Sequence, residues 1–580
     1  MPATLYLVVR ISAALAMVTI ALRWPQVGSS ILRALESRLY LFARRRWLAI
    51  VTVGGLAIVG SAAIALATRI PQPYITDEFG HLLGAETLAS GRLSNPTHPM
   101  WRHFESPQVL QKPTYVSRYP PGQALLFAVG EIVGQPIIGV WLGAGLACGA
   151  ICWMLQGWFR PGIAFVGALL ALYKIGVTTY FSQSYWGGMM AVLGGALIYG
   201  AVKRVLVRPQ VGASIALAVG LALLAITRPF EGFLASVPVF VVLVYRALRR
   251  QPERTLFLKR VVAPICATGL LALLWMGYYN FRQTGHATLT AYQVYSRNYQ
   301  VSPIFTWGRP VLQQSPMAAI NAMAKWSTGA PRPTRRQHLI EFWTFYCGVA
   351  FTLPLLLALF AMRSYYWCAL VSVAAVLGGL IVGSPSIFQH YAAPMAGPFF
   401  ILVTYGLSRL RAIRFGGRRT GLFVARMLVL FCVATLVLRI AGQSLGVKQE
   451  SRHGSLVALA TFALTSGPPI AEWPYQRAAM EGDLERSGGA HLIVVRYSPN
   501  HNPNQEWVYN KPDIDRAAVV WARAIDPQSD QKLIEYFHSR RIWLLDADQP
   551  SPKLVPYPGL SSAQATSIPG SGIKLPARSR

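Results

Sequence analysis

Long apolar stretches recur through the first 445 of the 580 residues, and they restrict the fold more than any other feature of the chain. Each approaches the roughly 20 apolar residues that a helix needs to cross a bilayer. Only 13% of the residues are charged and the mean hydropathy is +0.39, whereas a soluble domain carries about 25% charged residues. The candidate spans are 5–22, 47–69, 137–157, 161–180, 188–206, 211–227, 229–247, 260–279, 341–361, 367–384, 392–408 and 421–444.

Clusters of Lys and Arg between these stretches indicate which side of the membrane each connector faces. The chain has 54 Lys and Arg against 22 Asp and Glu. The positive-inside rule places the clusters in the cytoplasm. Because topology accounts for the surplus of positive charge, we expect no nucleic-acid partner. The clusters lie at 23–46, 201–210, 246–260 and 409–420.

The stretch 119–134 decides the orientation of everything that follows it. It is short, carries two prolines near its start and contains Glu131. If it crossed the membrane, the later basic clusters would lie outside, so we expect it to be re-entrant or interfacial. The outer face then receives loops 70–118 and 281–340 and everything after residue 445. The chain is therefore predicted to be a multi-pass protein of a cell's inner membrane with an extracytoplasmic C-terminal domain.

The composition turns soluble from about residue 446. Strand and helix patterns follow one another there, with helices at 472–487 and 531–539 and strands at 491–497, 518–523 and 541–547. This spacing predicts a parallel strand pair in a small α/β domain over 446–548. The Pro-, Ser- and Gly-rich end, 549–580, is predicted to be disordered. The full expectation is an all-α polytopic membrane protein with about 11–13 transmembrane helices. It has an N-terminal helix and basic linker (1–46), a transmembrane domain (47–445) and this C-terminal domain.

The predicted outer segment 281–340 departs from the charge rule. It has seven Lys or Arg and no acid, accompanied by several tyrosines and tryptophans. One interpretation is an interfacial amphipathic segment with aromatic anchors. The other is a cradle for an anionic lipid headgroup, and the residues leave both open.

The first outer loop, 70–118, holds the densest set of polar residues in the predicted membrane domain. Asp77 and Glu78 come directly after the span 47–69. A carboxylate at this level is partly desolvated, which raises its basicity and suits it to act as a base. Alternatively, Asp77 caps the helix that follows, and Glu78 interacts favourably with the dipole of its first turn.

Four more residues of this loop are candidates for binding a substrate or a metal. His98 and His103 are possible metal ligands with Asp77, or histidines satisfied within the loop. Lys112 and Arg118 flank a Pro-bounded turn. They suit a phosphate group, which accepts charged hydrogen bonds, or they are solvated loop charges.

Further candidates lie at helix ends on the same predicted face. Arg228 and Glu231 join two apolar helices, where charged side chains need a partner, either a ligand or each other. His390 and Tyr391 open another helix at this level and either pack at the interface or contact a ligand. The turn 182–188 adds polar and aromatic groups with two glycines, which permit close approach.

Taken together, residues 45–445 resemble the GT-C class of integral-membrane glycosyltransferases, which includes protein O-mannosyltransferase-like and lipid A aminoarabinose transferase-like enzymes. The resemblance rests on Asp77-Glu78 after an early membrane helix, the long outer loop and the helix start Arg118-Tyr119-Pro120-Pro121. It implies a donor sugar on a polyprenyl phosphate and makes Asp77 the catalytic base or a metal-associated carboxylate. It also maps Arg118-Tyr119-Pro120-Pro121 to the Lys/His-Pro-Pro element of the class. We expect the donor phosphate to bind among Arg118, Lys112 and basic residues of 281–340, with Tyr119 nearby. Two features depart from the class. Residues 182–186 contain no acid, which speaks against a two-acid metal site, and Gly122 stands where Leu is common. No cofactor is certain, and a divalent metal stays open.

The function expected from these residues is transfer of a hexosyl or pentosyl group from a polyprenyl-phosphate donor. The acceptor would be an envelope lipid, glycan or protein at the extracytoplasmic face. The alternative is a transporter or lipid flippase with an extracytoplasmic domain. No predicted span between 188 and 445 carries an acid at mid-membrane for ion coupling, which speaks against transport. A third interpretation is a non-catalytic scaffold for envelope assembly.

Overall fold

The structure is a computed structural model, and it describes a subset of the chain. The described residues are 19–20, 23, 26, 29–249, 254–299, 305–308, 334–384, 387–444, 472–502 and 504–558. Nearly all of the predicted span 5–22 lies outside them. The same holds for residues 309–333 of the second outer loop, the stretch 445–471 and residues 559–580 of the predicted disordered tail.

Within the described ranges, eight helical segments are long and apolar enough to cross a membrane, by length and composition. Two of them, α12–α13 and α16–α17, are each joined by a π-turn, at Leu258–Val262 and Trp343–Cys347. The fold class predicted from the sequence, a helical polytopic membrane protein, is confirmed. The segments are α3 (Arg46–Ala67), α6 (Pro136–Trp158), α9 (Met189–Val207), α11 (Pro229–Arg249), α12 (Arg254–Phe257) with α13 (Ala263–Thr284), α16 (Arg335–Phe342) with α17 (Gly348–Phe360), α18 (Trp367–Gly383) and α20 (Thr420–Ser444).

Three other predicted spans form shorter helices. They are α7 (Pro161–Ala171), which continues as a π-turn to Gly176, α10 (Val211–Ala225) and α19 (Ala396–Ala412). The stretch 119–134 forms α5 (Gly122–Ile132), which has 11 residues. At 1.5 Å per residue, α5 is about 16 Å long, roughly half of the ~30 Å hydrocarbon core. Its length supports the expectation that this stretch does not cross the membrane.

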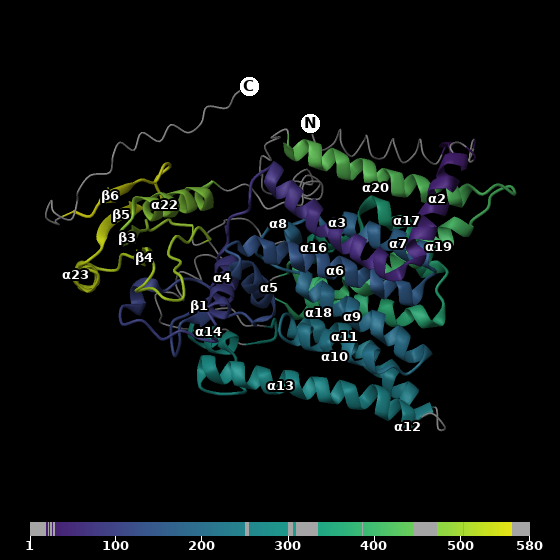
Figure 1. Cartoon of the computed structure of the whole chain (residues 1–580), viewed down its shortest axis with the longest axis horizontal. Coiled ribbons are helices and arrows are strands. Elements are labelled where there is room, and N and C mark those ends of the chain that lie inside the picture. The colour runs from purple at the N-terminus through teal and green to yellow at the C-terminus, as the bar shows by residue number, and fades with distance from the viewer. Residues whose placement is uncertain are drawn as a thin grey trace.

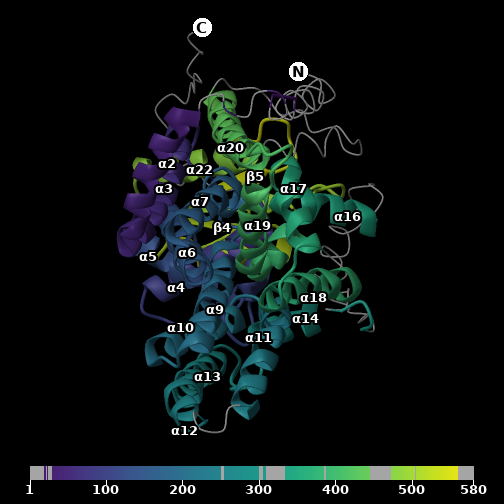
Figure 2. The ribbon, with the colours of Figure 1, turned by 90° about the vertical axis from the view of Figure 1, so that its right-hand side faces the viewer.

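The bundle is packed through small residues where helices meet. A Cβ atom on Gly54 of α3 would lie 2.9 Å from the carbonyl oxygen of Gly145 on α6, so these two backbones touch. Membrane helices use such small residues to approach closely, because apolar burial alone does not drive them together. In both views α12–α13 lies at one edge of the bundle (Figures 1 and 2).

The basic linker contains an amphipathic helix, α2 (Ser29–Arg44). Its Glu36 carboxylate accepts hydrogen bonds from Arg411 at 2.8 Å and from Arg426 at 2.7 Å. These ion pairs fasten α2 to α19 and α20, at the end of the bundle where the basic clusters predict the cytoplasm.

The C-terminal domain, residues 472–558, is a four-stranded sheet in the order β4-β3-β5-β6. Strand β3 pairs in parallel with β4 and β5, and β6 is antiparallel to β5. The predicted α/β domain and its parallel pairing are therefore confirmed. The last strand extends the sheet past residue 548 into a stretch predicted to be disordered. The elements are α22 (Trp473–Ser487), β3 (His491–Arg496), β4 (Val519–Arg523), α23 (Pro527–Tyr536), β5 (Arg541–Asp546) and β6 (Leu554–Pro556).

The first outer loop lies between this domain and the helix bundle (Figure 1). Phe104 of the loop packs in the core of the sheet face that α23 covers, and Phe79 packs on the α22 face. The Tyr115 hydroxyl donates to the carbonyl of Asn510 at 2.8 Å. The loop and the domain therefore share a core. The loop contains α4 (Thr76–Ala89), η1 (Trp101–Phe104), β1 (Val109–Leu110) and β2 (Val116–Ser117).

Candidate active site

A cavity of about 510 Å³ lies where the first outer loop meets the helix bundle. Its walls come from α4, the start of α5, the turn 186–188, the α10–α11 junction, the end of α13 and the start of α14 (Ala291–Tyr299). The cavity brings together five residues that the sequence selected from three separate segments. They are Arg118, Tyr119, Arg228, Glu231 and Tyr391.

Asp77 lies at the edge of this cavity, bonded to two of its lining residues. Its carboxylate accepts a hydrogen bond from Trp186 Nε1 at 2.9 Å and another from the Tyr119 hydroxyl. Helix α4 begins at Thr76 with Ile75 as its N-cap. The interpretation that Asp77 caps this helix is therefore wrong. Two neutral donors fix the direction of the carboxylate.

Glu78 supplies the capping that the sequence suggested for Asp77. Its fully buried carboxylate accepts the backbone N–H groups of Tyr74 at 2.7 Å, Ile75 at 3.2 Å and Tyr185 at 2.8 Å. Burial raises the pKa of Glu78 to about 7, although the three hydrogen bonds favour the charged form. The side chain joins the start of α4 to the turn that carries Trp186. It is therefore placed to position Asp77 rather than to contact a substrate.

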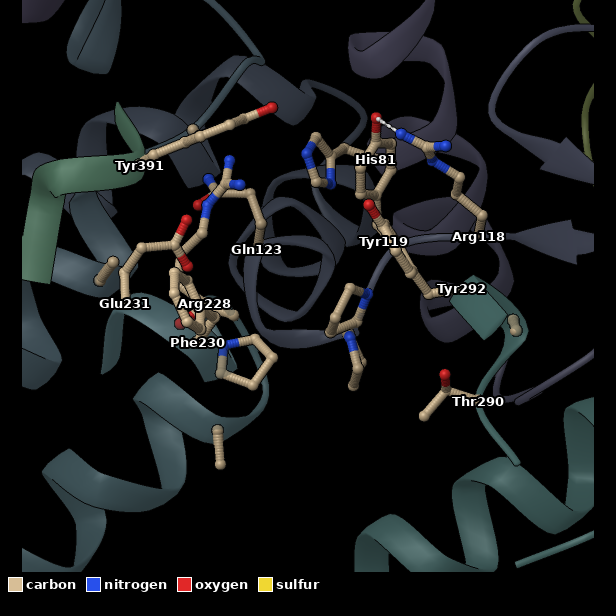
Figure 3. A pocket seen from close by; sticks show the side chains of 18 of the residues that line it. His81, Arg118, Tyr119, Gln123, Arg228, Phe230, Glu231, Thr290, Tyr292 and Tyr391 are labelled. Carbon is tan, nitrogen blue, oxygen red and sulfur yellow. Dashed lines mark hydrogen bonds between the residues drawn. The ribbon is translucent and has the colours of Figure 1, made fainter. Parts of the chain in front are cut away.

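Arg118 forms one wall of the cavity among tyrosine rings (Figure 3). Its guanidinium carbon lies 5.0, 4.9 and 4.8 Å from the ring centres of Tyr119, Tyr292 and Tyr295. One terminal nitrogen donates to the Tyr119 hydroxyl at 3.3 Å. Its Nε is buried and has no hydrogen-bond partner among the described residues.

Arg228 lies across the cavity from Arg118, beside Tyr391 and Glu231 (Figure 3). Its guanidinium carbon is 4.4 Å from the centre of the Tyr391 ring. Glu231 is buried and interacts electrostatically with Arg228. The two side chains attract each other, as one interpretation expects, and both line the cavity, where the other interpretation expects them to contact a ligand.

His390, in η6 (Gln389–Met395), packs behind the cavity wall. Its Nδ1 is 3.2 Å from the Tyr180 hydroxyl, and its ring centre is 4.7 Å from that of Trp186. Burial, with the positive charge of Arg228, holds its pKa well below the usual range. This geometry matches the packing interpretation of His390, in which it supports Trp186.

The structure does not bring His98, His103 or Lys112 to the cavity. His98 donates to the Asp515 carboxylate at 3.0 Å and His103 to the carbonyl oxygen of Arg523 at 2.8 Å. Both histidines are buried against the C-terminal domain and serve docking. Lys112 is exposed, with its Nζ 4.4 Å from the Trp101 ring centre. Across the part of the chain that is described, no group of three His, Cys, Asp or Glu could hold a metal ion.

Sequence reasoning did not select His81, which lines the cavity. Its ring stacks on Tyr119 with centres 4.4 Å apart. The signal was its spacing, since residues four apart lie on one face of a helix. Asp77 and His81 have that spacing. The sequence analysis began the helix after Asp77, so the two residues were not treated as neighbours on one helix face.

No protein-family model and no curated protein matches the chain. Among solved structures it is similar to ArnT from Cupriavidus metallidurans in the apo state, with a TM-score of 0.46 and 13% identity over 85% of this chain and 92% of that one. It is also similar to the oligosaccharyltransferase of Archaeoglobus fulgidus in the apo form, with a TM-score of 0.44 and 12% identity over 86% and 69%. The arabinosyltransferase EmbB from Mycobacterium smegmatis gives 0.37 and 14% over 71% and 40%. All three are GT-C glycosyltransferases, the class that the sequence resembles. Because these TM-scores are low, the function proposed below rests on the chain's own residues.

Proposed function

We propose that this chain is an inner-membrane glycosyltransferase that moves a sugar from a polyprenyl-phosphate donor to an acceptor on the outer face. One observation carries the proposal. Arg118 and Arg228 line one cavity of about 510 Å³ beside the ends of membrane helices, and the Asp77 carboxylate is hydrogen-bonded to Tyr119 and Trp186 in its wall. A cavity of this size suits a sugar phosphate, and its position gives a lipid tail access to the bilayer.

Arg118 is the better of the two arginines for the donor phosphate. Glu231 offsets the charge of Arg228. Arg118 has three tyrosine rings around it and a buried Nε without a partner among the described residues. A phosphate accepts two parallel hydrogen bonds from a guanidinium group. The lipid tail would leave along α13, where Leu271 and Leu274 are 69% and 62% exposed.

The reaction needs one base and close positioning. The acceptor hydroxyl oxygen attacks the anomeric carbon, the bond from that carbon to the phosphate oxygen breaks, and the lipid phosphate leaves with the bonding electrons. Asp77 takes the hydroxyl proton. Because a phosphate monoester is already a good leaving group, the protein contributes mainly orientation and the base. Tyr119 and Trp186 hold the Asp77 carboxylate in place for this step.

We propose that the C-terminal domain holds the acceptor, which would be an envelope lipid, glycan or protein. Its Tyr509 ring packs on Phe79 of α4 with centres 4.8 Å apart, and its hydroxyl donates to Glu86 at 3.1 Å. These contacts lie on the helix that carries Asp77. The transferred group would be a hexosyl or pentosyl unit.

Transfer by the purified chain in proteoliposomes tests the proposal. Undecaprenyl-phosphate-linked hexoses and pentoses are supplied with an envelope extract, and release of undecaprenyl phosphate is measured together with labelled product. We expect release with at least one donor and a large loss in Asp77→Asn. Movement of an intact fluorescent lipid-phosphate sugar across the bilayer without release would instead support the flippase alternative.

A further inference from the structure

His81 is a cavity residue that the reaction described above does not use. It is 7% exposed and lines the cavity beside Tyr119. It lies four residues after Asp77 on α4, so the two side chains share one face of the helix. The stacked Tyr119 ring, at an interplanar angle of 30°, holds the imidazole beside the carboxylate.

The imidazole lacks a hydrogen bond that its burial calls for. Its Nδ1 is buried and has no partner among the described residues. Buried polar side-chain atoms in native structures nearly always have a partner. Rotation about the Cβ–Cγ bond of histidine is soft, so a group bound in the cavity can satisfy this nitrogen.

The charges around His81 restrict the kind of group that it can bind. Arg118 and Arg228 stand on either side of it, and burial together with these charges lowers the pKa of His81 to about 3, against the opposing pull of Asp77. The ring is therefore neutral and offers one donor and one acceptor nitrogen. The phosphate of a lipid-linked sugar only accepts hydrogen bonds and can match only the donor nitrogen, whereas a sugar hydroxyl donates and accepts at once and can match either nitrogen.

We propose that His81 is a specificity-determining residue that hydrogen-bonds one hydroxyl of the transferred sugar. This inference rests on the proposed function and deepens it. Asp77 takes the proton of the acceptor hydroxyl, and Arg118 binds the donor phosphate. His81 hydrogen-bonds a nearby hydroxyl of the sugar. A donor sugar without that hydroxyl would leave the buried imidazole unsatisfied, so the site rejects it.

Two substitutions distinguish the contribution of the imidazole's hydrogen bond to specificity from that of the ring's shape. His81→Phe keeps the stack on Tyr119 and removes both nitrogens, and His81→Asn keeps a donor and an acceptor. The probes are the undecaprenyl-phosphate sugar that the wild type uses best and its monodeoxy analogues. We expect the wild type to discriminate against one analogue by about 10²-fold in kcat/KM. His81→Phe should use that analogue and the parent sugar about equally, and His81→Asn should keep part of the preference.

Asp77→Asn is the matched control, because it should slow transfer from every donor by the same factor. The ratios of kcat/KM between donors should therefore stay unchanged. Binding of the same donor pairs by calorimetry gives a readout that needs no turnover. If the wild type binds the donors but transfers no sugar, the proposed function is wrong. The ratio of the dissociation constants for the parent donor and its deoxy analogue still tests the role of His81.

Two results would overturn the assignment of His81. One is an unchanged preference in His81→Phe or, should that variant not fold, in His81→Leu, which also lacks both nitrogens. The other is binding of Mn²⁺ by the wild type that is lost in His81→Asn, since this would make the imidazole a metal ligand.

Discussion

At the scale of single residues, Asp77 gives the most direct prediction. Asp77→Asn keeps an oxygen that accepts from Trp186 and removes the basicity, so the protein should fold, insert and bind donor normally. Loss of a general base costs about 10²–10⁴ in rate, and we expect kcat to fall by that amount in the proteoliposome assay. Turnover near the wild-type level would remove Asp77 from the mechanism.

Arg118 gives a prediction about the donor rather than the rate. Lys lacks the planar fork of Arg and stacks less well on aromatic rings, so Arg118→Lys should weaken donor binding. Loss of one charged hydrogen bond corresponds to about 1.5–3 kcal/mol, measured as the Kd for undecaprenyl phosphate. Arg102→Lys, an exposed change on the same loop, is the control. Equal affinities in the two variants would contradict the phosphate role.

Glu78 predicts how stability depends on pH. Its folded pKa of about 7 lies above the ordinary value of 4.5. Between these values the folded protein holds more protons than the unfolded chain, so stability falls as the pH rises from 4.5 to 7. The melting temperature of Glu78→Gln should vary less across this window than that of the wild type. Glu86, whose pKa burial raises to about 8, contributes to the slope that remains. Equal slopes in the two proteins would contradict the buried carboxylate.

The residues that sequence analysis selected and that line the cavity share a property that the sequence displays. Arg118, Arg228 and Tyr391 each follow or precede an apolar segment, and helix ends at one membrane level meet in space. His98 and His103 did not join them, because their partners Asp515 and Arg523 lie more than 400 positions away in the chain. No local spacing reveals a contact of that kind.

At the scale of elements, most apolar helices and all the strands of the C-terminal domain up to residue 546 were predictable from periodicity. The start of α4 was not. Asp and Glu stand side by side there, and both are favourable in a first turn. Glu78 became the capping group because its longer side chain reaches back to Tyr74 and Ile75 and also to Tyr185. That third contact is a tertiary one, and no local sequence pattern reveals it.

At the scale of the whole molecule, the membrane topology of the chain is the prediction to test. In a variant without its six natural cysteines, Ser539→Cys on the C-terminal domain should react with an impermeant maleimide added to intact spheroplasts. Thr255→Cys, which is also exposed, should react only after lysis. Both positions are exposed, so a difference in labelling would report the side of the membrane. Labelling at Thr255→Cys alone in intact spheroplasts would invert the topology and place the cavity on the cytoplasmic side.

Helix α4 carries Asp77 in its first turn and Glu86, the partner of Tyr509, nine residues later. A helix of this length is a stiff rod, and the two side chains stand about 13 Å apart along it. One continuous helix therefore connects the contact with the C-terminal domain to the carboxylate, which Trp186 and Tyr119 hold at its other end. In the proposed reaction, an acceptor held by the C-terminal domain would therefore be positioned through the same helix as the base that deprotonates it.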